Sequence, residues 1–384
     1  MAGEITYEQL LAGREVVVVC GPGGVGKTTM AASSALLAAQ HVGGRVLVLT
    51  VDPARRLANA LGLDGLGNTE VQVDPALLAA TGTEPRGELW AAQLDTKESW
   101  DGLVRRHAPD PATRDAILAN SLYENVTGTF VQSHDYIAME RLHELHASGR
   151  YDLIIVDTPP SRNAIDFLDA PERMAEFFSS RLLRWLTVPY RSRLFTAASR
   201  PFYSVADRVL GQQFLRDIAD FFLLFQTMYE GFVERAEEVQ RTLQSRRTSF
   251  VVVSTLEAGS VSECSYFLDE LVARELHLGA VVLNRVLPDY LGNRRAATSA
   301  RTLIRESEAL GARFGGAEPA LMARVLEEIG ESFLDYGIAA ARQKDLRSDL
   351  AEIPQTVATV PYLATDVVDI GGLAAVAENL RTPR

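Results

Sequence analysis

Short apolar runs rich in valine, isoleucine and leucine recur along the chain and predict buried β-strands. Seven runs stand out, at residues 15–20, 45–51, 89–94, 151–157, 249–255, 278–284 and 356–360. A strand that is apolar along its whole length is buried on both faces, which is typical of parallel sheets. Most intervals between the runs carry helical periodicity, as strand–helix–strand crossovers do. The pattern therefore predicts an α/β fold with a doubly wound, mostly parallel sheet of about seven or more strands.

Two intervals are too long for one crossover helix, and they lie roughly at residues 100–148 and 167–247. The second carries apolar residues at helical spacing, namely Phe214, Ile218, Phe221, Phe222 and Phe225. We interpret both intervals as a helical insertion on the ligand edge of a single domain, residues 1–384. Such residues either pack the core, the commoner outcome, or line a groove for a client helix. A third helical stretch, residues 294–350, precedes the last predicted strand.

Composition narrows the class of protein and its partners. Apolar residues make up 47% of the chain and the formal net charge is −12, which argues against binding to a nucleic-acid backbone. The two cysteines, Cys20 and Cys264, are too far apart for a cysteine-rich metal site or a disulfide framework. Residues 1–15 are acidic, and no apolar run reaches about 18 residues. We therefore expect no signal peptide, no transmembrane segment and a cytoplasmic location.

The strongest motif is GPGGVGKTT, residues 21–29, between the first predicted strand and an alanine-rich helix. It fits the P-loop pattern, with Gly21, Gly26, Lys27 and Thr28 in the fixed positions. The glycines let backbone N–H groups surround phosphate oxygens, and the helix N-terminus favours an anion. Lys27, one of only three lysines in the chain, would reach the outer phosphates, and the Thr28 hydroxyl would bind Mg²⁺. A glycine-rich turn without a ligand is the alternative interpretation.

Two aspartates follow predicted strands at the same edge of the sheet. Asp157 ends the run at residues 151–157, and Asp52 follows the run at residues 45–51. A carboxylate beside the phosphate loop can hold Mg²⁺ directly or through water, which is the role we assign to Asp157. Asp52 could orient or deprotonate the attacking water. Each aspartate could instead begin a turn without any catalytic role.

Together these segments resemble the arsenical-pump (ArsA-type) ATPase family. GPGGVGKTT, VDPARRLANAL and DLIIVDTPPSRNAIDFLDAP occur in the order and spacing of that family, and LWAAQLDTKESW, VVLNRV and ATVPYL add support. The family includes the eukaryotic ATPases that target tail-anchored membrane proteins and is related to the MinD and ParA ATPases. The resemblance spans nearly the whole chain. It implies a dimeric, ATP-binding and ATP-hydrolysing switch that uses Mg²⁺ and acts on a client or partner protein, such as a membrane-protein segment.

The resemblance also implies roles for individual residues. Asp52 would activate water in the first switch, Asp157 would bind Mg²⁺ through water in the second, and Lys27 would act in catalysis. Asn284 matches the asparagine that reads adenine, and Pro361 falls where a loop flanks the adenine ring. The nucleotide would be held by the phosphate-loop residues Gly21, Gly23, Gly24, Val25, Gly26, Lys27, Thr28 and Thr29.

One departure from the family concerns Pro22, which stands where the family has a lysine that reaches the partner subunit's phosphates. Proline has neither a charge nor an N–H group, and a cation supplied in trans contributes roughly 10³–10⁵ to phosphoryl transfer. Either a paralogue that carries the lysine completes a heterodimer, or Arg55, Arg56 or Arg162 replaces the lysine in a homodimer. The alternative function is therefore a nucleotide-binding regulatory subunit with weak or no hydrolysis of its own.

Two other functions are disfavoured by the residues present. Arsenite capture needs soft thiolates, and two distant cysteines provide no three-sulfur site, so we do not expect arsenite transport. The CxxC of the zinc site in the eukaryotic targeting ATPases is also missing. A small-molecule kinase would need a basic acceptor pocket, for which Arg181, Arg184 and Arg191 form the nearest cluster. A solvated surface is the simpler explanation of that cluster.

Overall fold

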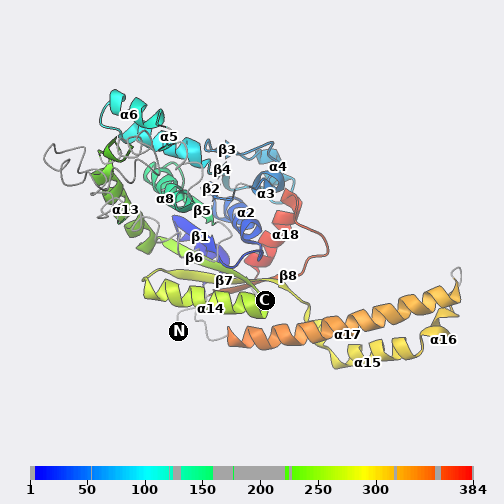
Figure 1. Cartoon of the computed structure of the whole chain (residues 1–384). Helices are drawn as coiled ribbons and strands as arrows, with labels where there is room; N and C mark the ends of the chain where they lie inside the picture. The colour runs from blue at the N-terminus through cyan, green and yellow to red at the C-terminus, as the bar shows by residue number, and fades with distance from the viewer. Residues whose placement is uncertain are drawn as a thin grey trace, which may run out of the picture.

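The computed structural model describes residues 5–52, 54–120, 122–123, 131–158, 176, 221–224, 227–314, 318–350 and 356–382. Within these residues one eight-stranded sheet has the order β3-β4-β2-β5-β1-β6-β7-β8 (Figure 1). The strands are β1 (Val16–Cys20), β2 (Gly44–Thr50), β3 (Val71–Gln72), β4 (Gly87–Gln93), β5 (Leu153–Asp157), β6 (Thr248–Thr255), β7 (Leu278–Val286) and β8 (Thr356–Pro361). All neighbouring strands are parallel except β3, which runs antiparallel to β4. The predicted α/β class and mostly parallel sheet are confirmed.

Along the central strands, alternate side chains pack into two separate apolar cores, one on each face of the sheet. On β1, Val16 and Val18 face one core, whereas Val17 and Val19 face the other. The second core is covered by α1 (Tyr7–Ala12), α2 (Lys27–Leu37), the π-helix η1 (Ala38–Val42), α3 (Arg56–Ala60), α4 (Pro75–Ala79) and α18 (Ile370–Arg381). The first core is covered by α5 (Thr96–His107), α6 (Pro111–Leu118), α8 (Val131–Ala147), α13 (Tyr229–Gln244) and α14 (Ala258–Ala273). Helices on both faces make the sheet doubly wound.

The described helices of the two long intervals pack apolar side chains against the first core. Trp100 of α5 stacks on Tyr136 of α8 with ring centroids 5.7 Å apart, and Phe232 of α13 meets the Tyr136 ring at 5.6 Å. Phe221 is buried next to Phe222. Three other residues of the predicted helical repeat, Phe214, Ile218 and Phe225, lie outside the described residues.

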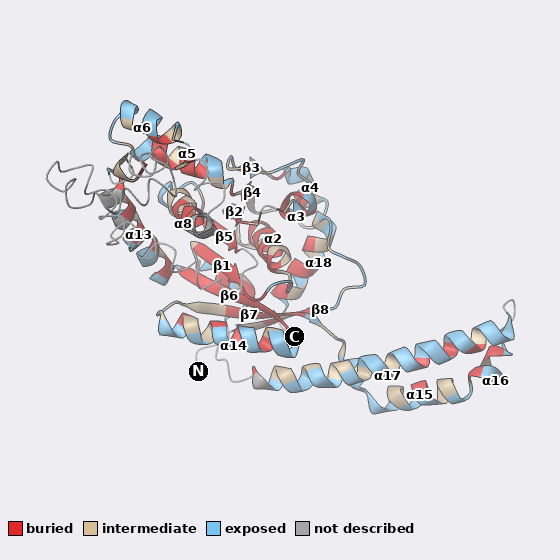
Figure 2. Cartoon of the chain, viewed as in Figure 1, coloured by how far each residue is buried: buried red, intermediate tan, exposed pale blue. Residues whose placement is uncertain are grey.

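The third predicted helical stretch forms an arm that stands away from the sheet. It consists of the 3₁₀ helix η2 (Asp289–Gly292), α15 (Arg294–Arg305), α16 (Ser307–Gly311) and α17 (Pro319–Asp349), and Figure 2 shows how much of it is exposed. Gly330 lets α17 approach α15 closely, because a Cβ there would lie 2.6 Å from the Ile304 side chain. At the root of the arm, Leu287 N–H donates a 2.8 Å hydrogen bond to the Gln343 side chain. No helix in the described part of the chain is long and apolar enough to cross a bilayer.

Candidate active site

The phosphate loop joins the end of β1 to the start of α2, at the carboxyl edge of the sheet. Gly21 has a φ of 138°, and a Cβ there would lie 2.1 Å from the carbonyl oxygen of Val253 on β6. Gly26 caps α2 with a φ of 96°, and its Cβ would lie 2.6 Å from the amide nitrogen of Asn284. Both positions therefore require glycine, for conformation and for space. The loop leaves the N-terminus of α2 open toward a cleft.

Lys27, the first residue of α2, is buried and closes the loop on itself. Its Nζ donates to the carbonyl oxygens of Gly21 at 3.1 Å and Pro22 at 3.0 Å. Burial lowers the pKa of the Lys27 ammonium, and the nearby carboxylate of Asp157 opposes that shift. Since ammonium donors prefer charged acceptors, an entering polyphosphate would compete with these carbonyls for Nζ.

Asp157 ends β5 and is fully buried beside the loop. Its Oδ2 accepts a 2.9 Å hydrogen bond from the Thr50 hydroxyl, while its Oδ1 has no partner among the described residues. Burial raises the pKa of Asp157 to about 6, although the hydroxyls of Thr28 and Thr50 and the Lys27 ammonium work against this. A buried carboxylate oxygen without a partner, next to the Thr28 hydroxyl, matches the all-oxygen ligand preference of Mg²⁺.

Asp52 lies two residues after β2 and is joined to Asp157 through one hydroxyl. The Thr50 Oγ1 that donates to Asp157 also accepts from Asp52 N–H at 3.2 Å. The Asp52 carboxylate accepts from Ala54 N–H at 2.9 Å, and its main-chain oxygen accepts from the Gln93 amide at 3.1 Å. The Asp52 side chain is thus fixed by its own turn while remaining half-exposed to the cleft.

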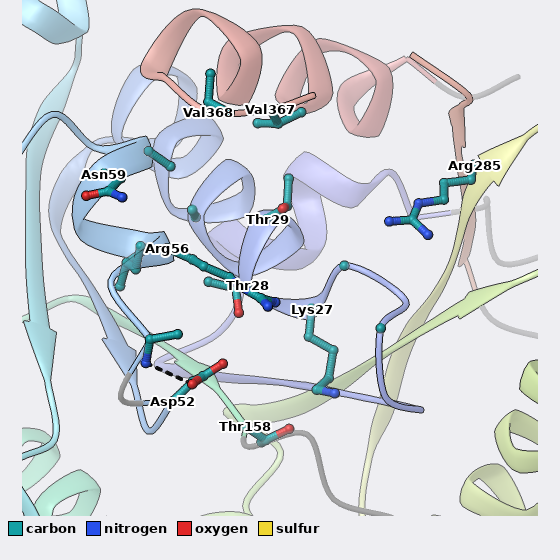
Figure 3. A pocket seen from close by; sticks show the side chains of 16 residues that line it. Lys27, Thr28, Thr29, Asp52, Arg56, Asn59, Thr158, Arg285, Val367 and Val368 are labelled. Carbon is teal, nitrogen blue, oxygen red and sulfur yellow. Dashed lines mark hydrogen bonds between the residues drawn. The ribbon is translucent and has the colours of Figure 1, made fainter. Parts of the chain in front are cut away.

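A cleft of about 640 Å³ brings several predicted residues together (Figure 3). From the predicted set it is lined by Gly24, Gly26, Lys27, Thr28, Thr29 and Asp52, and also by Arg56. Further lining residues are Ala32, Ala54, Leu57, Asn59, Ala60, Thr158, Arg285, Val367 and Val368. Of these, Arg285 follows Asn284 directly, and the valine pair follows the last strand. Their places after predicted strands are the one sequence signal that could have indicated them.

Other predicted site residues do not line the cleft. Asn284 lies behind the loop, where its amide nitrogen donates to the Val25 carbonyl at 2.8 Å and its oxygen accepts from Arg285 N–H at 2.9 Å. Pro361 ends β8, where it pairs with Val286. The remaining predicted residues outside the lining are Gly21, Gly23, Val25 and Asp157.

The candidate replacements for the missing lysine occupy different places. Pro22 is buried, and Arg55 is exposed at the start of α3. Arg56 is exposed and lines the cleft. Arg162 lies outside the described residues, as do Arg181, Arg184 and Arg191.

The cysteines provide no exposed soft-metal site. Cys20 and Cys264 are both buried, and burial raises the pKa of each thiol. Across the described ranges, no group of three or more histidine, cysteine, aspartate or glutamate side chains is placed to hold a metal ion. A metal at this edge would therefore need oxygen ligands from a bound phosphate in addition to Thr28 and Asp157.

Comparison with known proteins points to one family. A family model described as anion-transporting ATPase matches residues 14–307. An uncharacterized protein of Streptomyces coelicolor is 28% identical over 274 residues, and the alignment covers 71% of this chain and 63% of that protein. The ATPase GET3 of Lodderomyces elongisporus is 23% identical over 290 residues, covering 71% of this chain and 72% of that protein. A putative ATPase of Mycobacterium tuberculosis is 24% identical over 394 residues, covering 98% and 95%.

Proposed function

The chain belongs to the anion-transporting ATPase family, and from this premise we propose that it is an ATP-hydrolysing switch that drives a client or partner protein. The observation that supports this most is the cleft that unites Lys27, Thr28 and Asp52, together with the buried Asp157, which Thr50 links to Asp52. The groups to which we assign phosphate binding, metal binding and water activation thus lie at one edge of the sheet. A single domain spanning residues 1–384 would carry this site, with the helical insertion coupling it to the client.

Each residue has a distinct task in the proposed hydrolysis of ATP. Backbone N–H groups of the loop hold the phosphates, and Lys27 transfers its hydrogen bonds from the loop carbonyls to the outer phosphate oxygens. The Thr28 hydroxyl and, through water, Asp157 would hold Mg²⁺. Bound Mg²⁺ would neutralise charge on the outer phosphates. Asp52, held by Ala54 N–H, orients the water that attacks the terminal phosphate.

The proposed switch works as a dimer. Because Pro22 stands where the family has a lysine, the cation for the phosphates has to come from another residue. Since Pro22 offers no cation, a homodimer would depend on an arginine such as Arg56, and a heterodimer on a paralogue with the missing lysine. If neither operates, the chain is a regulatory subunit that binds nucleotide and hydrolyses it weakly or not at all. We propose neither arsenite nor nucleic acid as the partner, because both cysteines are buried and the chain is acidic.

Steady-state phosphate release from MgATP by the purified full chain tests the proposal. Lys27→Ala serves as the blank. The matched control is Lys97→Ala, because Lys97 is an exposed lysine on α5 that pairs with Asp101. Turnover above the blank supports an active ATPase. ATP binding without turnover favours the regulatory subunit. If ATP is neither bound nor hydrolysed, both versions of the function are wrong.

A further inference from the structure

A β-bulge interrupts β7 where it reaches the cleft. Leu283 pairs with Thr359 of β8 and Val286 pairs with Pro361, so three steps along β7 match two steps along β8. The extra residue lies at positions 284–285. A bulge bends its strand and re-aims a side chain that regular alternation would direct elsewhere. Here the side chain concerned is that of Arg285, which lines the cleft.

The backbone of Arg285 adopts a conformation that favours glycine. Its φ is 57°, and the Asn284 side-chain oxygen holds it there by accepting the Arg285 N–H. Among the described non-glycine residues, the other one with a positive φ is Glu275, which ends α14 in the usual left-handed cap, with Leu276 N–H bonded to Leu271 O. No such cap explains Arg285. Strain of this kind is a reason to look for a function of the side chain.

The strand order indicates which part of a nucleotide Arg285 would meet. Asp52 and Thr158 follow β2 and β5, on one side of the central strand β1, whereas Arg285 is on β7, on the other side. A nucleotide whose terminal phosphate faces Asp52 therefore extends its nucleoside toward β7. In Figure 3 the Arg285 side chain extends from the end of β7 toward the phosphate loop, and Val367 lies on the segment before α18. Val367 and Val368 give this side of the cleft an apolar surface, which suits the base of a nucleotide and not its charged phosphates.

We propose that Arg285 binds the base of the nucleotide, with its planar guanidinium packed on the face of the purine ring. Guanidinium groups stack on aromatic rings through cation–π attraction, and a lysine ammonium lacks the plane that makes this contact broad. The assignment rests on the proposed nucleotide function of the same cleft. It gives the chain a base-binding residue next to Asn284, whose amide is already bound to the loop and to Arg285.

Calorimetric titration of the full chain with MgATP and with magnesium tripolyphosphate, which lacks a base, separates base from phosphate contacts. Arg285→Gly removes the side chain and suits a φ of 57°. We expect this variant to bind ATP about tenfold more weakly, to bind tripolyphosphate within about twofold of wild type, and to unfold at the same or a higher temperature. Arg285→Lys keeps the charge, and we expect it to lose most of the same ATP affinity.

Equal losses for ATP and tripolyphosphate would overturn the assignment and make Arg285 a phosphate ligand. Unchanged ATP affinity in both variants would also overturn it, while the nucleotide function would stand. If Arg285→Gly fails to fold, Arg285→Lys carries the comparison of the two ligands. A wild-type chain that binds neither ligand would instead overturn the nucleotide function, and the base-binding role with it.

Discussion

The side-chain amide nitrogen of Asn284 donates a 2.8 Å hydrogen bond to the main-chain carbonyl of Val25, so the end of β7 supports the phosphate loop. The absence of a side chain at Gly26 leaves room for this contact. The Asn284 oxygen meanwhile holds Arg285 N–H. One buried amide therefore connects the phosphate loop to the strand that carries Arg285, and it uses one of its two N–H donors and one acceptor site of its oxygen to do so.

Replacing Asn284 by alanine tests whether this residue supports the loop or reads the base. We expect Asn284→Ala to weaken ATP and GTP binding alike, by about tenfold, because a buried hydrogen bond of about 1 kcal/mol or more is lost. Asn379→Ala is the matched control, since its amide also bonds a main-chain carbonyl, that of Ala375, on the exposed side of α18. Titrations with both nucleotides measure the effect. A loss confined to ATP would show that Asn284 reads adenine instead.

Strands were predictable from sequence because burial on both faces leaves an uninterrupted apolar run. β3 was missed because its two residues, Val71 and Gln72, are exposed and carry no such run. The phosphate loop was predictable because its chemistry fixes the spacing from Gly21 to Thr28. The buried strands and the phosphate loop each depend on residues that are close together in the sequence, so the residue pattern is enough to predict them.

The positions of Arg285, Val367 and Val368 after predicted strands are a sequence signal for the sheet edge, but they do not show that these residues line the cleft. Arg285 enters the cleft through a bulge, and a bulge depends on the register between two strands that lie about seventy residues apart. Val367 and Val368 line the cleft only because β8 ends beside β7. The hydrogen bond from Thr50 to Asp157 likewise follows from the pairing of β2 with β5, which places these two residues opposite each other.

The buried carboxyl of Asp157 should make the nucleotide-free protein less stable as the pH rises. Its pKa is raised from the usual 3.8 to about 6 in the folded state, so the folded protein binds the proton more tightly than the unfolded chain does. The contribution of this protonated carboxyl to the stability of the folded protein is complete below about pH 4, and it is lost as the pH rises through 6. At pH 8 the ionised carboxyl costs up to about 3 kcal/mol, from 1.36 kcal/mol per pKa unit.

Asp157→Asn should remove that cost because the amide is uncharged. We expect its free energy of unfolding in denaturant at pH 8, without nucleotide, to exceed that of wild type by about 1–3 kcal/mol, with the difference arising between about pH 4 and 6. The added stability from magnesium and ATP should be smaller in the variant, since a metal-facing carboxylate is lost. A variant that is less stable than wild type at pH 8 would contradict the prediction.

Asp52→Asn should separate binding from hydrolysis. The amide oxygen that this substitution introduces can still accept the Ala54 N–H bond that fixes the turn, but it cannot take a proton from water. We expect ATP affinity within about threefold of wild type and phosphate release lowered about a hundredfold or more, in line with general-base contributions of roughly 10²–10⁴. Asp64→Asn is the control, because Asp64 is an exposed aspartate that does not line the cleft. Normal phosphate release by Asp52→Asn would exclude its role in activating water.

Arg56 and Arg55 are adjacent exposed arginines with different positions relative to the cleft, so together they form a matched pair. Arg56 lines the cleft on α3, whereas Arg55 precedes that helix and is not part of the lining. A cation that meets the transferred phosphoryl group contributes roughly 10³–10⁵ to the rate, so we expect Arg56→Ala to lower kcat about a hundredfold or more. Arg55→Ala should stay within about twofold, as surface substitutions usually do.

Single-turnover formation of phosphate, measured after acid quench of the two arginine variants, reports the hydrolysis step without the later release of ADP. The result matters because Pro22 cannot supply the charge that the family's lysine provides. A selective loss in Arg56→Ala would mean that the chain itself supplies the cation that Pro22 cannot provide. If both variants keep the wild-type rate without any second protein, Arg56 is not the replacement. If wild-type turnover requires a paralogous subunit that carries the lysine, the heterodimer is the correct assembly, and Arg56→Ala should then have little effect.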